Sequence, residues 1–135
     1  MTGRWTLQEA ALSPIPRSCA MATVLNNSLY VIGGWLRYLN AFSDVWRFDI
    51  ALQEWTPVPI TNIAPSASGT LATANGKIYM YGGIFQFSNG SNYLIGDVTE
   101  IDPVTNRAVL LTPSSAGSVP PPRQLHSAVV YNNTM

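Results

Sequence analysis

Charge is scarce in this sequence. Only 10% of its 135 residues are Asp, Glu, Lys or Arg, against about 25% in an average domain. Basic and acidic residues balance and lie scattered along the chain, so no basic patch for nucleic acid is predicted. Long apolar runs are also missing. None approaches the roughly 18–20 residues of a transmembrane helix, so no membrane span is predicted within this chain.

Cysteine and histidine, which often act in catalysis or metal binding, occur once each. Cys19 excludes an internal disulfide and a thiolate metal cluster, and its small neighbours predict a buried, unreactive side chain. His126 has no Cys, Asp or Glu at ligand spacing, so a packed or hydrogen-bonded histidine is predicted rather than a metal ligand. No paired carboxylates and no nucleophile motif stand out. We therefore predict no catalytic residue, no metal and no cofactor, and hence no enzyme activity for this chain itself.

What the sequence does contain is a repeat. The stretch 29–34, Leu-Tyr-Val-Ile-Gly-Gly, returns as Ile-Tyr-Met-Tyr-Gly-Gly at 78–83, displaced by 49 residues. Four apolar residues before a glycine pair are typical of a buried strand that ends where the backbone needs conformational freedom or approaches another segment closely. A period near 50 is typical of propeller repeats.

Each copy predicts four strands. Asn26-Asn27 and Asn75-Gly76 favour tight turns, so each copy opens with a β-hairpin. A long variable loop follows, 35–43 or 84–96, and then a third strand (44–49 or 97–102) and a fourth (around 54–58 or 107–111). The predicted divisions are 1–15, the last strand and connector of a preceding unit; 16–64, a complete unit; 65–121, a complete unit with longer loops; and 122–135, the first strand of a following unit.

This pattern resembles the kelch repeat of β-propellers. The resemblance implies an all-β fold, a partial β-propeller with two complete four-stranded antiparallel kelch blades plus flanking strands. The residues that carry it are Gly33, Gly34, Trp46, Asp49, Trp55, Gly82, Gly83 and Asp102.

The blade assignment gives these residues structural roles. The glycines are expected to serve the backbone, and Trp46 and Trp55 to pack between blades. In the second copy Thr99 and Ala108 replace the two Trp residues, and Leu110 or Leu111 is expected to supply the missing volume. Two blades cannot close a ring, so the remaining blades or self-association are expected as partners.

Strand direction places the long loops and the connectors 58–65 and 112–122 on one rim. The candidate partner-binding residues of this rim are Trp35, Arg37, Tyr38, Phe85, Phe87 and Tyr93, since aromatic residues and Arg dominate binding hot spots. For each aromatic residue, anchoring of its loop to the blade is an equally good interpretation. Arg17 and Arg123 begin the innermost strands, where they either face the channel mouth or donate to neighbouring carbonyls.

Two hypotheses about function follow. In the first, the chain is a protein-interaction scaffold that binds a protein or peptide at the long-loop rim. In the second, it is the non-catalytic part of a propeller enzyme, an oxidase or sugar isomerase, since such enzymes resemble kelch propellers. Their active-site residues would then lie outside this chain.

Overall fold

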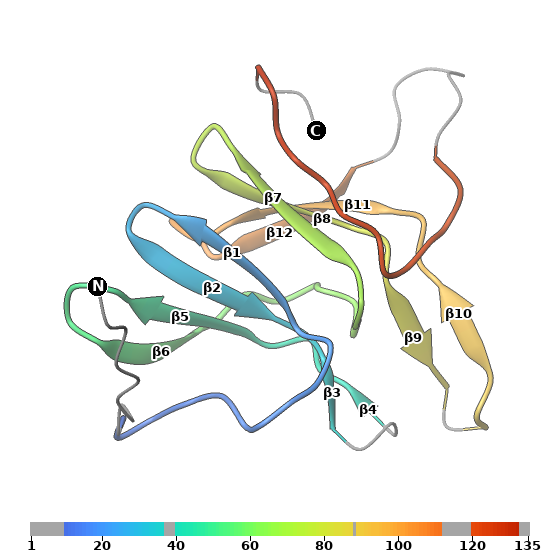
Figure 1. The fold of residues 1–135 in the computed structure, drawn as a ribbon, viewed down its shortest axis with the longest axis horizontal. Coiled ribbons are helices and arrows are strands. Elements are labelled where there is room, and N and C mark those ends of the chain that lie inside the picture. The colour runs from blue at the N-terminus through green and yellow to red at the C-terminus, as the bar shows by residue number, and fades with distance from the viewer. Residues whose placement is uncertain (1–9, 37–39, 88, 112–119, 133–135) are drawn as a thin grey trace, which may run out of the picture.

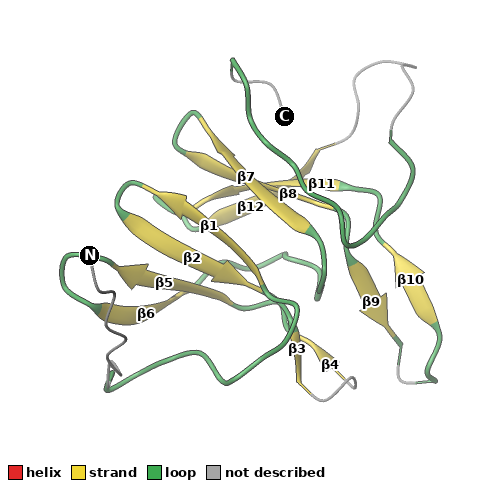
Figure 2. Cartoon of the chain, in the orientation of Figure 1, coloured by secondary structure: helices red, strands yellow, loops and turns green. Residues whose placement is uncertain are grey.

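The computed structural model describes residues 10–36, 40–87, 89–111 and 120–132. They form two four-stranded antiparallel sheets and two short hairpins (Figures 1 and 2). The first sheet has the order β1 (Met21–Leu25), β2 (Ser28–Ile32), β5 (Val45–Asp49), β6 (Glu54–Val58). The second repeats it with β7 (Thr70–Ala74), β8 (Lys77–Tyr81), β11 (Val98–Asp102), β12 (Arg107–Leu111). The predicted all-β fold is confirmed, and each sheet is one blade.

The expected variable loops contain hairpins of their own. In the first blade β3 (Trp35–Leu36) pairs with β4 (Asn40–Ala41), and in the second β9 (Ile84–Gln86) pairs with β10 (Asn92–Leu94). The sequence did not predict these strands, because they are only two or three residues long. Both hairpins project from the same end of the blades (Figure 1).

The tight turns follow from local chemistry. Asn26, Asn27 and Asn75 adopt positive φ, a conformation that Asn tolerates well. At the turn between the last two strands of each blade, one carboxylate organises the chain. Oδ1 of Asp49 accepts hydrogen bonds from the amides of residues 51 and 52, and Oδ1 of Asp102 accepts from those of 104 and 105. These amide donors lower the pKa of Asp102.

The core lies between the two sheets. Side chains alternate along each strand, so the buried residues Met21, Tyr30, Ile32 and Val45 share one face of the first sheet. They belong to the same cluster as Leu71, Ile78, Met80 and Ile101, which share one face of the second sheet. The connector between the blades adds Ile60 and Ile63 to this cluster.

Trp46 and Trp55 do not contribute to this core. Cross-strand register places them on the opposite face of the first sheet, where both are half-buried. The Trp55 ring packs on Phe48 with centroids 5.1 Å apart, and Trp46 Nε1 donates to Asp44. Within the described residues, the predicted packing between blades at this face is absent, because no described sheet lies against it.

Leu110 and Leu111 do not supply core volume. They are 57% and 37% exposed, whereas Ala108 packs against the core. The expected substitution of leucine for tryptophan is therefore wrong. The cluster against which Ala108 packs includes residues of the first blade and the connector residues Ile60 and Ile63, which the sequence assigned to a loop.

The segments that flank the two blades form no strand among their described residues, 10–15 and 120–132. Of the expected strand at 122–135, residues 122–132 form no strand, and Tyr131 makes only an isolated bridge. Trp5, on which the expected strand within 1–15 depends, lies outside the described residues. Instead of a strand, residues 120–126 run across the end of the second blade, where the Tyr81 hydroxyl donates to the carbonyl of Pro120.

Successive repeats are joined by main-chain hydrogen bonds. The amide of Ser68 donates to the Cys19 carbonyl (3.0 Å), and that of Leu125 donates to the Ser68 carbonyl (2.8 Å). All three residues have positive φ, near 54°, 60° and 56°. Cys19 is exposed, so the prediction of a buried thiol is wrong: its position is fixed by its backbone rather than by packing of its side chain.

Candidate functional site

The glycine pairs position the long-loop rim. The Gly34 amide donates to the Ser66 carbonyl (2.9 Å), and the Gly83 amide to the Arg123 carbonyl (2.8 Å). Each pair therefore binds the start of the next repeat. A Cβ on Gly33 would lie 2.2 Å from the Ser66 carbonyl oxygen, and the φ of Gly33 is +65°, so only glycine fits.

Arg17 fastens this junction in the first blade. Its guanidinium donates to both carboxylate oxygens of Asp44 and to the Gly33 carbonyl, and it lies 4.2 Å from the centre of the Phe42 ring. Burial alone would raise the pKa of Asp44, but the hydrogen bonds from Arg17 and Trp46 outweigh it and lower the pKa. The structural interpretation of Arg17 is thus confirmed.

In the second blade Ser66 takes the place of Arg17. Its hydroxyl donates to the Gly82 carbonyl, the counterpart of the Gly33 carbonyl. Arg123 donates to the Pro121 carbonyl, a local contact like that of Arg17 with Ile15.

The rim residues predicted from the sequence divide into three groups. Trp35 is only 8% exposed and anchors the β3–β4 hairpin through main-chain bonds to Ser18. Arg37 and Tyr38 lie outside the described residues. Phe85, Phe87 and Tyr93 come together on one face of the β9–β10 hairpin.

This aromatic face follows from the register of the hairpin. Tyr93 lies directly opposite Phe85, and Phe87 stands two residues along the same face. The Phe85 and Phe87 rings meet edge to face, with centroids 4.9 Å apart. Phe87 is 47% exposed and Tyr93 53% exposed. A large aromatic surface therefore faces solvent on a hairpin whose base is held by hydrogen bonds to the blade, Ile84 to Ala67 and Ile95 to Gly83.

The other face of the hairpin borders a shallow cavity of about 200 Å³. Sequence reasoning missed its polar residues, because carboxamides have no motif and come from distant segments. The lining residues are Trp35, Ile84, Gln86, Asn92 and Gln124. Three carboxamides over an apolar floor offer both donors and acceptors without charge.

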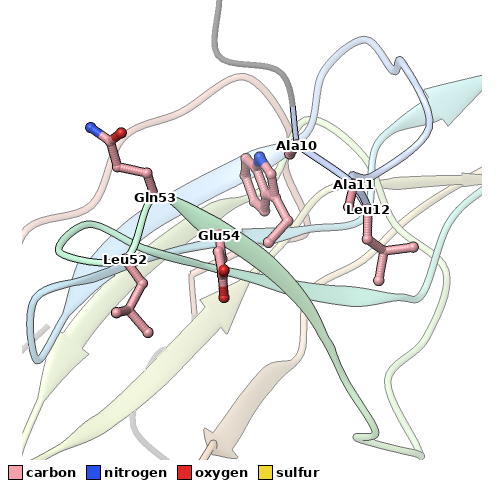
Figure 3. Close-up of a pocket in the computed structure, with 7 residues that line it drawn as sticks. Ala10, Ala11, Leu12, Leu52, Gln53 and Glu54 are labelled. Atoms are coloured by element: carbon pink, nitrogen blue, oxygen red, sulfur yellow. The ribbon is translucent and has the colours of Figure 1, made fainter.

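A larger open cavity, about 490 Å³, lies at the other end of the first blade (Figure 3). Residues 10–12 and the turn at 52–54 line it beside Trp55. Figure 3 shows Leu52, Gln53 and Glu54 on one side of it and Ala10, Ala11 and Leu12 on the other. It contains none of the rim residues predicted from the sequence.

His126 packs where the last described segment crosses the second blade. Its ring meets Tyr81 edge to face at 5.3 Å, and neither buried ring nitrogen has a hydrogen-bond partner among the described residues. Burial, and then the nearby Arg123, lower the pKa of this histidine. A packed histidine is confirmed, and no residue of the described part of the chain caps its ring by a hydrogen bond.

Two kinds of feature are absent from the described residues. No three His, Cys, Asp or Glu side chains gather there in a way that suits a metal ion. No helix in that part of the chain has the length and apolarity needed to cross a bilayer.

Comparison with known proteins identifies the repeats. A family described as the KLHDC2/KLHL20/DRC7 Kelch-repeats domain matches residues 2–135. The chain is 30% identical over 91 residues to the tRNA wybutosine-synthesizing protein 2/3/4 of Arabidopsis thaliana, covering 66% of this chain and 9% of that protein. It is 26% identical over 144 residues to human host cell factor 1, covering 96% of this chain and 7% of that protein.

A solved structure shares the fold. This chain matches the structure of YjhT with a TM-score of 0.70 and 24% sequence identity. The match covers 90% of this chain and 33% of the YjhT chain. The present chain thus spans less than a tenth of the two curated relatives and a third of the solved one.

Proposed function

Because this chain belongs to the kelch-repeat family, we propose that its two blades present the long-loop rim as a binding site for a protein or peptide partner. The observation that carries the proposal is the exposed aromatic face of the β9–β10 hairpin. Large aromatic side chains dominate binding hot spots, because they remove much apolar surface from water at low cost in side-chain entropy.

The support of the hairpin favours binding over simple loop anchoring. An anchoring aromatic is buried, as Trp35 is, whereas Phe87 and Tyr93 are about half exposed. The main-chain bonds at residues 84 and 95 hold the base of the hairpin in a fixed orientation. A preorganised surface loses less conformational entropy when a partner binds.

The relatives also agree with a module of variable specificity. The two relatives are named as a tRNA wybutosine-synthesizing protein and a host cell factor, and each matches this chain over less than a tenth of its own length. A scaffold that recurs in such different proteins takes its specificity from the surface loops it displays. We accordingly propose a binding role for this chain, with no chemical step of its own.

Selection of displayed random peptides against the chain tests the proposal. We expect the wild type to enrich peptides that the double variant Phe87→Ala, Tyr93→Ala binds at least about tenfold more weakly, which corresponds to ~1.4 kcal/mol. The matched control is Val104→Ala, an apolar residue 82% exposed at the opposite rim. Equal affinity of the wild type and the double variant for every enriched peptide would contradict the proposal.

A further inference from the structure

The outer edge of β10 is open. In the β9–β10 hairpin the Phe87 amide donates to the Ser91 carbonyl, and the Ile95 amide donates to the Gly83 carbonyl. Residues 87 and 91 and residues 83 and 95 are therefore hydrogen-bonded pairs, and the alternation of an antiparallel ladder makes 85 and 93 a third. The amides and carbonyls of Asn92 and Leu94 must then point away from β9.

The opposite edge of the hairpin, formed by β9, shows the hydrogen bonds that this register predicts. Ile84, which pairs with Leu94, turns its amide and carbonyl away from β10 and exchanges both hydrogen bonds with Ala67. Among the described residues, none pairs with the outer edge of β10 as Ala67 pairs with Ile84, and β9 is the only strand beside β10. Asn92 and Leu94 thus offer two donors and two acceptors to an incoming chain.

This edge also lacks the residues that protect edge strands. Proteins commonly guard an edge with charged side chains or proline, which disfavour pairing with another chain. The outermost strands of the two blades follow this rule, since β6 contains Glu54 and Pro57 and β12 begins at Arg107. Residues 84–94 contain no charged residue and no proline, and Tyr93 and Leu94 are 53% and 40% exposed.

We propose that β10 binds an uncharged, extended segment of a partner protein as a third strand of this hairpin. The inference rests on the proposed function and specifies its mode, in which main-chain hydrogen bonds supply affinity and alternate side chains supply selectivity. The partner residue opposite Tyr93 lies on the aromatic face and is apolar. The residue opposite Asn92 lies on the face of the carboxamide-lined cavity and is a small polar residue such as Thr or Ser.

A synthetic peptide of alternating Thr and Val, seven residues long with acetyl and amide caps, is the probe. Its affinity for the full chain is measured by titration calorimetry, with shifts of the 92 and 94 amide signals followed by NMR. We expect saturable binding and shifts confined to the hairpin. Absence of binding at about 1 mM peptide, equivalent to a free energy weaker than ~4 kcal/mol, would overturn the inference.

Leu94→Pro tests the main-chain contact. Proline removes the outward amide of residue 94 and leaves the β9–β10 bonds in place, because that amide makes none of them. Leu94→Ala is the matched control, since it loses the same side chain and keeps the amide. We expect at least about tenfold weaker binding for Leu94→Pro and less than about threefold for Leu94→Ala; equal losses would overturn the inference.

Methylated peptides test the same contact with the protein unaltered. An added strand turns every second amide toward β10, so N-methylation of either the Thr nitrogens or the Val nitrogens, but not both, should abolish binding. The set that does so reports whether the added strand is antiparallel or parallel. If neither set or both sets abolish binding, strand addition is excluded.

The protein variants separate this inference from the proposed function. If the double variant Phe87→Ala, Tyr93→Ala no longer binds the selected peptides while Leu94→Pro binds them normally, the rim remains the binding site and only strand addition fails.

Discussion

Phe48 in the first blade and Ile101 in the second occupy the same place in the repeat, but their surroundings differ. Phe48 is half-buried against Trp55 on a face that no described sheet covers, whereas Ile101 is completely buried against the first blade. The other pairs on this face differ in the same way: Trp46 and Trp55 in the first blade correspond to Thr99 and Ala108 in the second. A repeat position therefore does not by itself determine packing; the neighbouring blade does.

The opposite faces show the same contrast. In the first blade Tyr30 is buried in the core. Its counterpart Tyr79 donates to Glu100, which also accepts from Lys77, on the face of the second blade turned away from the first. Burial and then the Glu100 hydrogen bond raise the pKa of Tyr79. Equivalent tyrosines thus act as an apolar side chain in one blade and as a hydrogen-bond donor in the other.

Of all the substitutions considered, Ile101→Ala should lower the stability most, and Phe48→Ala is its counterpart in the first blade. We expect Ile101→Ala to cost ~2–5 kcal/mol in the free energy of unfolding, because it leaves a cavity between the sheets. Phe48→Ala should cost only about 1–2 kcal/mol despite the larger side chain, since that ring is half-solvated. Urea unfolding followed by tryptophan fluorescence measures both. Equal costs would show that the face of Phe48 is as well packed as the core.

Exchanging the residues at the tryptophan position sharpens the comparison. Thr99 is 8% exposed, so Thr99→Trp should overpack the second blade and cost ~1–3 kcal/mol. Trp46→Thr removes one hydrogen bond to Asp44 and part of a half-buried ring, so we expect about 1 kcal/mol. Thermal unfolding of both variants checks the ranking. A Thr99→Trp variant as stable as the wild type would mean that the sheets can separate to admit the ring.

Arg17→Ser, which gives the first blade the serine of the second, should have a smaller effect than Ile101→Ala or Thr99→Trp. We expect a loss of about 1–2 kcal/mol near pH 7, less than for a fully buried pair because the Asp44 side chain is 39% exposed. The stability that Asp44 contributes through its lowered pKa is present above its unfolded value, near 3.8, and lost as the pH falls through the folded value.

The wild type should therefore lose its advantage over Arg17→Ser in acid. Unfolding measured at a series of pH values from 7 down to about 2 should show the two stability curves converging below about pH 4. Ser66→Ala is the control, since it removes the second blade's counterpart without touching a charge. Parallel curves over the whole range would contradict a role of the Arg17–Asp44 pair.

The repeat predicted most of the fold. Alternation, glycine pairs and asparagine turns are local signals, so both four-stranded blades and their tight turns were foreseeable from residues such as Asn75 and Gly82. The loop hairpins were not, because two- or three-residue strands such as β3 carry no periodicity. The core role of Ile60 and Ile63 was hidden for a different reason: they lie in a connector without a strand pattern, and the cluster that they join contains residues of both sheets.

The candidate site was predictable only in part. Aromatic residues in a variable loop pointed to Phe85, Phe87 and Tyr93, but Trp35 has the same composition signal and is buried. Exposure depends on the tertiary contacts of each side chain, which the sequence pattern does not encode. The carboxamides Gln86, Asn92 and Gln124 meet only after folding, so no spacing in the sequence brings them together.

The main-chain bonds that link Cys19, Ser68 and Leu125 have a consequence for how such a protein changes over time. A thiol, a hydroxyl and a branched alkyl group occupy three equivalent positions, and the bonds between them involve none of those side chains. The link between successive repeats thus consists of main-chain atoms and does not depend on which side chain occupies the position. These bonds therefore place no requirement on the side chain at the three positions, so substitutions there can accumulate without loosening the link between repeats.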